Sequence, residues 1–412
     1  MNRNIFLLWQ GQFVSQIGSQ AFSITMLYWL METTGSSAIM GTILAVSLIP
    51  SVLLGPFGGV FADRHSRKTI IVVTDIIRGL SVFLLALLMF STHDDTALII
   101  WMFFVVSTLN AASKAFFQPA IEAFMPILAD AEKLPKTIAY FGSSNQVATL
   151  VGQALGGMCY RLFGAPLLLL FDALSYLISA ISEMFIQSPA VKKTYISLPV
   201  KETYKSLIND LQEGLDYVFK NRGLMTVILC ASSINFFCAP IMLFLPFLVK
   251  NSLHEAAHWY GFMLAAMALG SMSGYWYSQH RKVKAAARAK FMFLSLLGAS
   301  VCFVVLGSSS STYISLTAIA LSGFFFGTFN LQSMALFQSV IPEAIRGRVL
   351  SLLITASTAL LPLGLVLSGI IGEISGNNTL LIYTSSGIAM GLVALVLVVD
   401  SYSSAFLATE NL

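Results

Sequence analysis

The sequence predicts an all-α integral membrane protein with twelve transmembrane helices in two halves of six. Of its 412 residues, 57% are hydrophobic and only 10% are charged, and the mean hydropathy is +0.81. Soluble domains carry about 25% charged residues, so this chain could not cover its own surface in water. The apolar runs between its polar breaks are roughly 18 to 27 residues long, which is the length that a helix needs to cross a bilayer.

Twelve such runs follow one another along the chain. They are continuously apolar, whereas a lipid-facing strand of a barrel would alternate every second residue. The first run contains Gln12, Gln16 and Gln20 and ends without a small-residue cleavage site, so we expect a retained helix and not a signal peptide. The expected spans cover residues 5–31, 38–61, 69–90, 97–121, 137–160, 165–187, 224–249, 257–279, 290–307, 312–338, 348–371 and 379–399.

The positive charges predict which side of the membrane each loop faces. With the N-terminus inside, all but four of the 23 Lys and Arg residues fall in inner loops; Arg161 and Lys250 fall outside, and Arg78 and Lys114 lie within spans. Inner loops are enriched in positive charge, so we expect both termini in the cytoplasm and the chain in the inner or plasma membrane of the cell. The net charge of +4 does not call for a nucleic-acid partner.

The longest polar stretch divides the chain into six spans and six spans. We expect an N-terminal six-helix half at residues 1–187, a cytoplasmic linker at 188–223, a C-terminal six-helix half at 224–400 and a cytoplasmic tail at 401–412. Apolar residues recur at helical spacing in the second part of the linker, which predicts an amphipathic helix along the inner interface. A division of this kind is typical of duplicated transporters.

The inner loop after the second span carries the most specific motif. Its string GVFADRHSRK resembles the signature loop of the major facilitator superfamily, with Gly59, Asp63, Arg64, Arg67 and Lys68 in register. The resemblance implies that Asp63 and Arg67 belong to a charge cluster that latches the two halves in the outward-open state. A carboxylate beside guanidinium groups at a helix end can break and re-form its contacts as helices move. Simple anchoring of positive charge on the inner side is the alternative.

Along nearly its whole length, the chain also resembles the macrolide-efflux type of drug:proton antiporter within that superfamily, which is similar to siderophore and antibiotic exporters. The matching strings are WQGQFVSQIGS, METTGSS, LGPFGGVFADRHSRK, AFFQPAIEAFMPIL and LPLGLVLSG. The resemblance implies a monomeric secondary exporter of a lipophilic or amphiphilic small molecule, working by alternating access and driven by proton antiport. The chain contains no Walker loop, so we do not expect it to hydrolyse ATP.

Two positions depart from the relatives. Many proton-coupled relatives carry a buried arginine in the fourth span, where this chain has Asn110, with Lys114 one turn further on. In the fifth span, the proline of the antiporter signature is replaced by glutamine after Gly152, while Gly156 and Gly157 are retained. A facilitator or importer of a nutrient or lipid-like metabolite, without proton antiport, is therefore the alternative function. The glycines form a small-residue face that serves either static helix packing or a moving contact.

Polar side chains within the spans are candidates for lining a substrate cavity. Gln12, Gln16 and Gln20 recur every four residues on one helix face. An uncompensated amide in lipid is costly, so this face should point at a cavity or a neighbouring helix. Family analogy, in which the first, fourth, seventh and tenth helices line the cavity, adds Asn110, Lys114, Asn235, Asn330 and Gln332. Hydrogen bonding between helices is the alternative for each.

Acidic residues within the spans are candidates for proton coupling. Asp75 lies three residues before Arg78 on one helix face, and we expect the two to neutralise one another. Asp172 has no cation nearby in its own span, so we expect it to be protonated, to pair with a residue such as Arg161, or to face a water-filled path. Asp172 is the first candidate for carrying a proton, followed by Glu122 and Asp75.

No pattern for catalysis or metal binding accompanies these features. The five histidines lie in loops or at span ends, without a HExxH set or paired carboxylates. The four cysteines have no CxxC or metal-ligand spacing. We therefore expect no enzymatic activity, no cofactor and no metal; the expected partners are a small-molecule substrate, the proton and the lipid bilayer.

Overall fold

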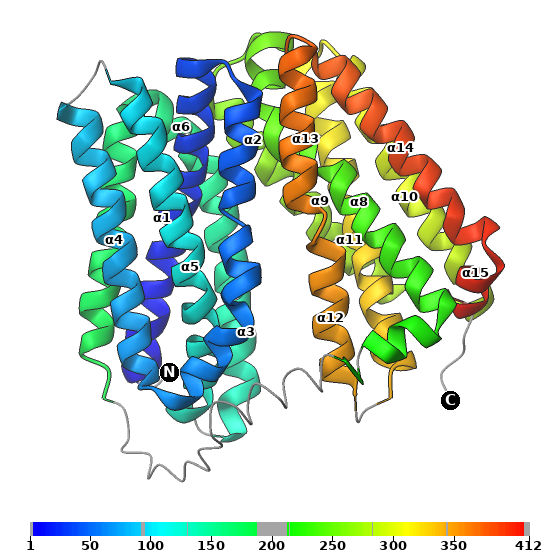
Figure 1. The fold of residues 1–412 in the computed structure, drawn as a ribbon, viewed down its shortest axis with the longest axis horizontal. Coiled ribbons are helices and arrows are strands. Elements are labelled where there is room, and N and C mark those ends of the chain that lie inside the picture. The colour runs from blue at the N-terminus through cyan, green and yellow to red at the C-terminus, as the bar shows by residue number, and fades with distance from the viewer. Residues whose placement is uncertain are drawn as a thin grey trace. The chain divides into compact units, whose positions relative to one another are not determined.

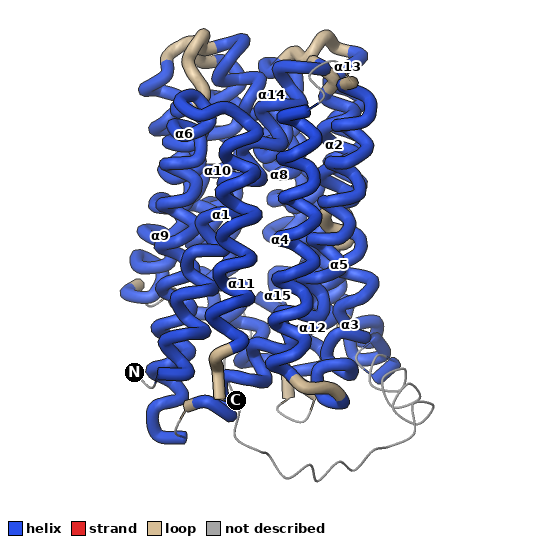
Figure 2. Tube along the Cα trace, turned by 90° about the vertical axis from the view of Figure 1, so that its left-hand side faces the viewer, coloured by secondary structure: helices blue, strands red, loops and turns tan. Residues whose placement is uncertain are grey.

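The computed structural model describes residues 3–91, 95–129, 131–187, 212–213, 215–281, 283–342 and 345–407. Within these ranges every regular element is a helix, as Figure 2 shows, and the expected all-α membrane fold is confirmed. Nine helical segments of the described chain are long and apolar enough to cross a membrane. The count of twelve spans stays a prediction.

The chain forms two compact units. Unit 1 comprises Met1–Ser197 with Ala256–Ala265, and unit 2 comprises Leu198–Glu255 with Ala266–Leu412. Most of the expected linker at 188–223 lies outside the described residues, although residues 215–220 within its amphipathic stretch are helical. The predicted boundaries of the two halves therefore stay predictions.

Unit 1 starts at the N-terminus and is drawn in blue to green in Figure 1. Its second helix begins after Ser36 and its fifth after Asp95, whose side chains accept hydrogen bonds from backbone N–H groups three residues on and so cap the helices. The elements are α1 (Arg3–Thr34), α2 (Ser37–Val46), α3 (Ile49–Arg64), α4 (Arg67–Ser91), α5 (Thr96–Leu128), the 3-10 turn Ala131–Lys133 and α6 (Leu134–Met184).

Unit 2 follows in green to red. Its elements are α8 (Arg222–Phe247), the π-helical turn Leu248–Ser252, α9 (His258–His280), α10 (Ala285–Ser308), α11 (Thr312–Val340), α12 (Arg346–Thr358), α13 (Leu361–Ile374), α14 (Thr379–Val399) and α15 (Ser401–Leu407). The first part of α9 belongs to unit 1. The expected tail at 401–412 thus starts as a helix, in which Phe406 and Leu407 are buried, and residues 408–412 lie outside the described chain.

Two expected spans are broken by prolines. The span expected at 38–61 is divided between α2 and α3, with Pro50 in the first turn of α3. The span expected at 348–371 is divided between α12 and α13, with Pro362 in the first turn of α13. Proline lacks a backbone N–H and crowds the preceding turn, so it suits a helix start and interrupts a continuing helix.

A glycine kink joins two expected spans in α6. The spans expected at 137–160 and 165–187 both fall in this element, and Gly164 between them has φ 73° and ψ 174°. A positive φ is open to glycine without steric cost. The two parts of α6 therefore meet at the position where the sequence places a loop.

Small residues allow α1 to lie close against both parts of α6. A Cβ on Gly152 would stand 2.7 Å from the Cβ of Gln20, and one on Gly156 would stand 2.7 Å from Cδ1 of Ile24. From the other side, a Cβ on Gly18 would stand 2.5 Å from Oδ1 of Asp172. Close approach through small residues is a common way to pack helices in lipid.

A second close contact joins α9 and α11 within unit 2. A Cβ on Gly274 would overlap the carbonyl group of Phe324, and a Cβ on Gly327 would overlap that of Ser271. Gly270 and Gly323 approach the partner helix in the same way. The two helices therefore pack backbone to backbone, which fixes the side chains on either side of the contact.

Candidate functional site

Among the residues of unit 1 that the structure describes, three acidic side chains are fully buried. Asp75 on α4 and Asp172 and Glu183 on the second part of α6 are each 0% exposed, and Arg78 on α4 is 7% exposed. Electrostatic interactions link Asp172 and Glu183 to both Asp75 and Arg78. We call these four residues the acid cluster.

Arg78 is the cation of the acid cluster. Its Nη1 lies 3.7 Å from Oδ1 of Asp75, which forms the ion pair that the three-residue spacing predicts. Its guanidinium group stands 4.6 Å from the ring centroid of Phe117 on α5 and 5.5 Å from that of Tyr176 on α6. Aromatic faces favour a desolvated cation, so these rings help to hold Arg78 inside the membrane.

Glu183 is held by donors from two helices. Nε2 of Gln12 on α1 donates to Oε1 of Glu183 at 3.0 Å, and the hydroxyl of Ser179 donates to the same oxygen at 3.4 Å. Oε2 of Glu183 has no hydrogen-bond partner among the described residues. Gln12 is thus buried against an acid within unit 1.

Asp172 has no hydrogen-bonding partner in the described part of the chain. Both of its carboxyl oxygens are buried without one, and Oδ1 lies against Gly18 on α1. Arg161, which the sequence offered as a possible partner, is exposed and does not share this environment. Asp172 therefore depends on the charge of Arg78, which already lies beside Asp75.

The charge balance of the acid cluster restricts its protonation. One guanidinium group can neutralise one carboxylate, whereas the cluster contains three carboxyl groups. An unpaired buried carboxylate is so costly that it takes up a proton instead. Among the described residues, no group of three or more His, Cys, Asp and Glu side chains is placed to hold a metal ion.

The residues of the motif loop lie at the junction of α3 and α4. Nη2 of Arg67 stands 3.6 Å from Oδ1 of Asp63, and Asp63 is largely exposed. Lys68 donates to the backbone carbonyl of Met184 at the end of α6 at 2.6 Å. Arg64 ends α3, and a Cβ on Gly59 would meet no atom within 4 Å.

The predicted packing glycines have different neighbours. Gly152 and Gly156 face α1 within unit 1, so these two pack neighbouring helices of one unit. A Cβ on Gly157 would instead stand 2.6 Å from the carbonyl oxygen of Ala257 and 3.2 Å from the backbone nitrogen of Gly261, at the start of α9. All three positions admit no side chain without a shift of the neighbouring atoms.

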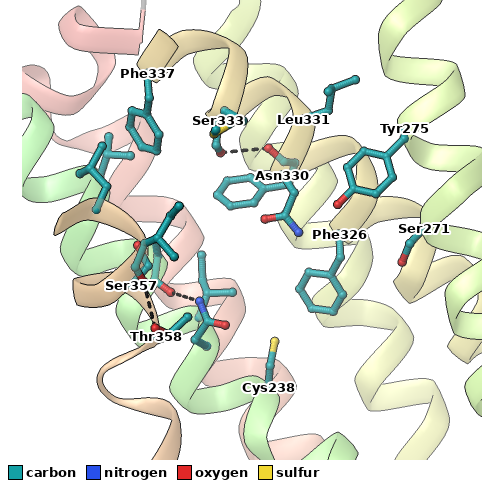
Figure 3. Close-up of a pocket in the computed structure, with 18 of the residues that line it drawn as sticks. Cys238, Ser271, Tyr275, Phe326, Asn330, Leu331, Ser333, Phe337, Ser357 and Thr358 are labelled. Carbon is teal, nitrogen blue, oxygen red and sulfur yellow. Dashed lines mark hydrogen bonds between the residues drawn. The ribbon is translucent and has the colours of Figure 1, made fainter. Parts of the chain in front are cut away.

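Unit 2 contains a cavity of about 690 Å³ (Figure 3). Polar side chains of four helices line it, together with aromatic and aliphatic ones. They include Asn235 and Cys238 from α8, Ser271 and Tyr275 from α9, Phe326, Asn330 and Ser333 from α11, and Ser357 and Thr358 from α12. A cavity of several hundred Å³ with a few polar groups among apolar walls is typical of a small-molecule site.

Two of the predicted cavity residues, Asn235 and Asn330, line this cavity, and a third does not. Gln332 on α11 is turned the other way, and its Nε2 donates to the hydroxyl of Ser278 on α9 at 2.8 Å. That bond supports the close contact between α9 and α11. The hydrogen-bonding alternative therefore applies to Gln332.

The remaining candidates are spread over unit 1. Oε1 of Gln20 accepts a hydrogen bond from Gln153 at 3.4 Å, and Gln16 is partly buried on the same helix. Oδ1 of Asn110 is buried without a partner among the described residues, and Lys114 is exposed. Glu122 is exposed and accepts from Gln118 at 2.8 Å, so it is not part of the acid cluster.

Sequence reasoning missed Glu183 as a site residue, although a signal was present. Asp172, Tyr176, Ser179 and Glu183 follow one another at intervals of four, three and four residues, which places them on one helix face. A polar stripe of this kind inside an apolar span indicates a shared environment. The same period joins Phe326, Asn330, Ser333 and Phe337 on the cavity side of α11.

These features define a class of protein. Membrane-length helices, a helix-lined cavity within one unit and buried acids within the other are typical of a multi-span membrane transporter, not of an enzyme. The chain belongs to the Major Facilitator Superfamily, whose family model matches residues 8–364.

Two named relatives show which transporters of this superfamily the chain is similar to. The chain is 26% identical over 382 residues to Macrolide efflux protein A of Streptococcus pyogenes, with 90% of each chain covered. It is 23% identical over 379 residues to the Staphyloferrin A transporter of Staphylococcus aureus, with 90% of this chain and 88% of the relative covered. The resemblance to macrolide-efflux and siderophore transporters is thus confirmed.

Solved structures support the fold. The crystal structure of the nucleoside transporter NupG matches with a TM-score of 0.73 at 15% identity, covering 99% of both chains. An inward-facing bacterial homologue of the human lysosomal transporter Spinster matches with a TM-score of 0.69 at 13% identity, covering 99% of this chain and 97% of the other.

Proposed function

We propose that this chain is a proton-driven secondary exporter of a lipophilic or amphiphilic small molecule. It acts as a monomer in the inner or plasma membrane, with both termini in the cytoplasm. Support for export comes from the name of one relative, Macrolide efflux protein A, while a second relative is named as a transporter of staphyloferrin A. The cavity of unit 2 is the substrate site in this proposal.

The proposed proton coupling is supported by the burial of Asp172 without a hydrogen-bond partner in the described chain. Its two oxygens have no hydrogen-bond partner in the described chain, and Arg78 beside it is already paired with Asp75. A carboxyl group that is closed off from water must be neutral or paired, whereas one that is open to water releases its proton. Alternating access therefore makes Asp172 take up a proton on the outer side and release it on the inner side.

In this proposal, the motif loop that contains Asp63 and Arg67 changes its contacts as the transporter switches between conformations. The exposed pair between Asp63 and Arg67 lies at the junction of two helices, where its contacts can be exchanged as the helices move. An exposed pair contributes only about 0–1 kcal/mol to stability. The role of the pair in this proposal is therefore to exchange its contacts during the transport cycle, and not to stabilise the fold.

Transport into inside-out membrane vesicles tests the proposal. Vesicles with the full chain are given an acidic interior and a panel of lipophilic and amphiphilic probes, including a macrolide, and accumulation is measured against vesicles without the chain. Accumulation that collapses when a protonophore removes the gradient supports proton-driven export. Movement that is indifferent to the gradient would refute antiport and favour the facilitator or importer.

A further inference from the structure

The side chains that line the cavity of unit 2 carry no formal charge. This holds for the lining residues that the structure describes, which come from α8, α9, α11 and α12. The buried acids lie on α4 and α6 of unit 1 and are not among them. A ligand in this cavity therefore meets hydroxyl, amide, thiol, aromatic and aliphatic groups.

Most hydroxyl groups that line the cavity donate their hydrogen to a backbone carbonyl of their own helix. Ser271 donates to the carbonyl of Met267 at 3.0 Å, and Ser333 donates to that of Phe329 at 2.9 Å. Thr358 donates to the carbonyl of Ile354 at 2.9 Å. A hydroxyl group whose hydrogen is engaged keeps oxygen lone pairs that can accept. These three residues therefore present hydrogen-bond acceptors to a ligand.

The amide of Asn235 also leaves a hydrogen-bond acceptor available to a ligand. Its Nδ2 donates to the carbonyl oxygen of Ala231 at 3.0 Å, and because that acceptor is a carbonyl, the amide orientation follows from chemistry. Its Oδ1 is left as a further acceptor. Four polar groups on four helices thus favour a ligand that brings hydrogen-bond donors.

The side-chain amide of Asn330 can both donate and accept hydrogen bonds in the cavity. Its side chain is exposed and lines the cavity together with Tyr275 and Phe326 (Figure 3). A side-chain amide that is open to a ligand offers two donors and an acceptor. Around it, Phe326, Phe329 and Met334 provide apolar and aromatic contact area.

We propose that this cavity selects an uncharged amphiphile that carries hydroxyl or N–H donors, with Asn235 and Asn330 as the specificity-determining residues. The inference rests on the proposed transport function and adds the charge class of the substrate. A charged ligand would lose its hydration here without gaining a counter-charge, whereas a hydroxyl group exchanges water for the acceptors already in place. Aromatic rings alone stabilise a cation by about 0.5–2 kcal/mol, which is small beside the cost of removing its water.

Occupancy of the cavity can be measured through Cys238, which lines it. Replacing Cys159, Cys230 and Cys302 by alanine leaves Cys238 as the only cysteine of the full chain. The rate at which N-ethylmaleimide alkylates this thiol is then measured in lipid nanodiscs with and without a probe. Three probes share one naphthyl-hexyl scaffold and end in an uncharged diol, a trimethylammonium group or a carboxylate.

The diol is expected to protect Cys238 at a concentration at least about tenfold lower than either charged probe, a difference of about 1.4 kcal/mol. Asn235→Ala and Asn330→Ala should each raise the protecting concentration of the diol several-fold. Asn330→Asp should move the preference toward the trimethylammonium probe. Gln332→Ala is the matched control, because that amide is bound to Ser278 away from the cavity, and it should leave the concentration at which the diol protects Cys238 unchanged.

Equal or better protection by a charged probe would overturn the proposal. So would asparagine variants that retain the melting temperature and the diol protection of the parent. If an alanine variant does not fold, Asn330→Ser and Asn235→Ser replace it. Alkylation of Cys238 reports binding and does not depend on transport. If the diol protects Cys238 but no probe moves in response to the gradient, the proposed transport function alone is overturned. If charged probes are transported and the diol gives no protection, this inference alone is overturned.

Discussion

Replacing Arg78 by glutamine removes the cation that faces three buried acids. At 3.7 Å, the Coulomb attraction between Arg78 and Asp75 is about 4.5 kcal/mol at an effective dielectric constant of about 20. Breaking one side of a buried pair typically costs about 3–5 kcal/mol, because the other charge is left unpaired. For a unit of about 200 residues, this corresponds to a fall in melting temperature of roughly 10 °C.

The double variant Asp75→Asn/Arg78→Gln separates the pair from the packing of its side chains. With both charges removed, most of the lost stability should return, and the double variant should melt within a few degrees of the parent. The single Arg78→Gln variant should also lose less stability at pH 5 than at pH 8, because protons then neutralise the uncompensated acid. Apparent melting temperatures of the purified full chain measure both effects. A double variant whose loss equals the sum of the two single losses would refute the coupling.

Three further changes test other parts of the account. Asp63→Asn should strongly slow transport while expression and melting stay unchanged, since its pair is exposed; normal turnover would argue against the latch. Gly327→Ala should cost about 1–3 kcal/mol because the methyl group overlaps a backbone carbonyl of α9, whereas Gly142→Ala, which meets no atom within 4 Å, should be neutral in the same melting assay. Gln12→Leu should cost about 1–3 kcal/mol by removing a donor from Glu183, and an unchanged melting curve would contradict that hydrogen bond.

The fold class followed from composition and run length because lipid leaves helices or closed barrels as the only ways to span a membrane. Local breaks were harder to locate. Pro50 and Pro362 interrupt runs whose hydropathy is continuous, and Gly164 joins two runs into one kinked element. Hydropathy averages over a window, whereas each of these features depends on the backbone of one residue.

The sites were predicted only where the sequence limits the possible partners. The Asp75–Arg78 pair follows from helical spacing within one helix. The bond between Gln12 and Glu183 joins residues 171 positions apart, so only the packing of α1 on α6 brings them together. Likewise, polarity alone could not distinguish Asn330, which faces the cavity, from Gln332, which faces Ser278.

Proton coupling through Asp172 is tested by two transport modes of the Asp172→Asn variant in proteoliposomes. Substrate counterflow needs alternating access but no proton, whereas accumulation driven by a pH gradient needs both. Asp172→Asn should keep counterflow and lose gradient-driven accumulation, while Glu122→Gln, outside the acid cluster, should keep both. Full gradient-driven accumulation by Asp172→Asn would contradict the assignment of the proton to this carboxyl group.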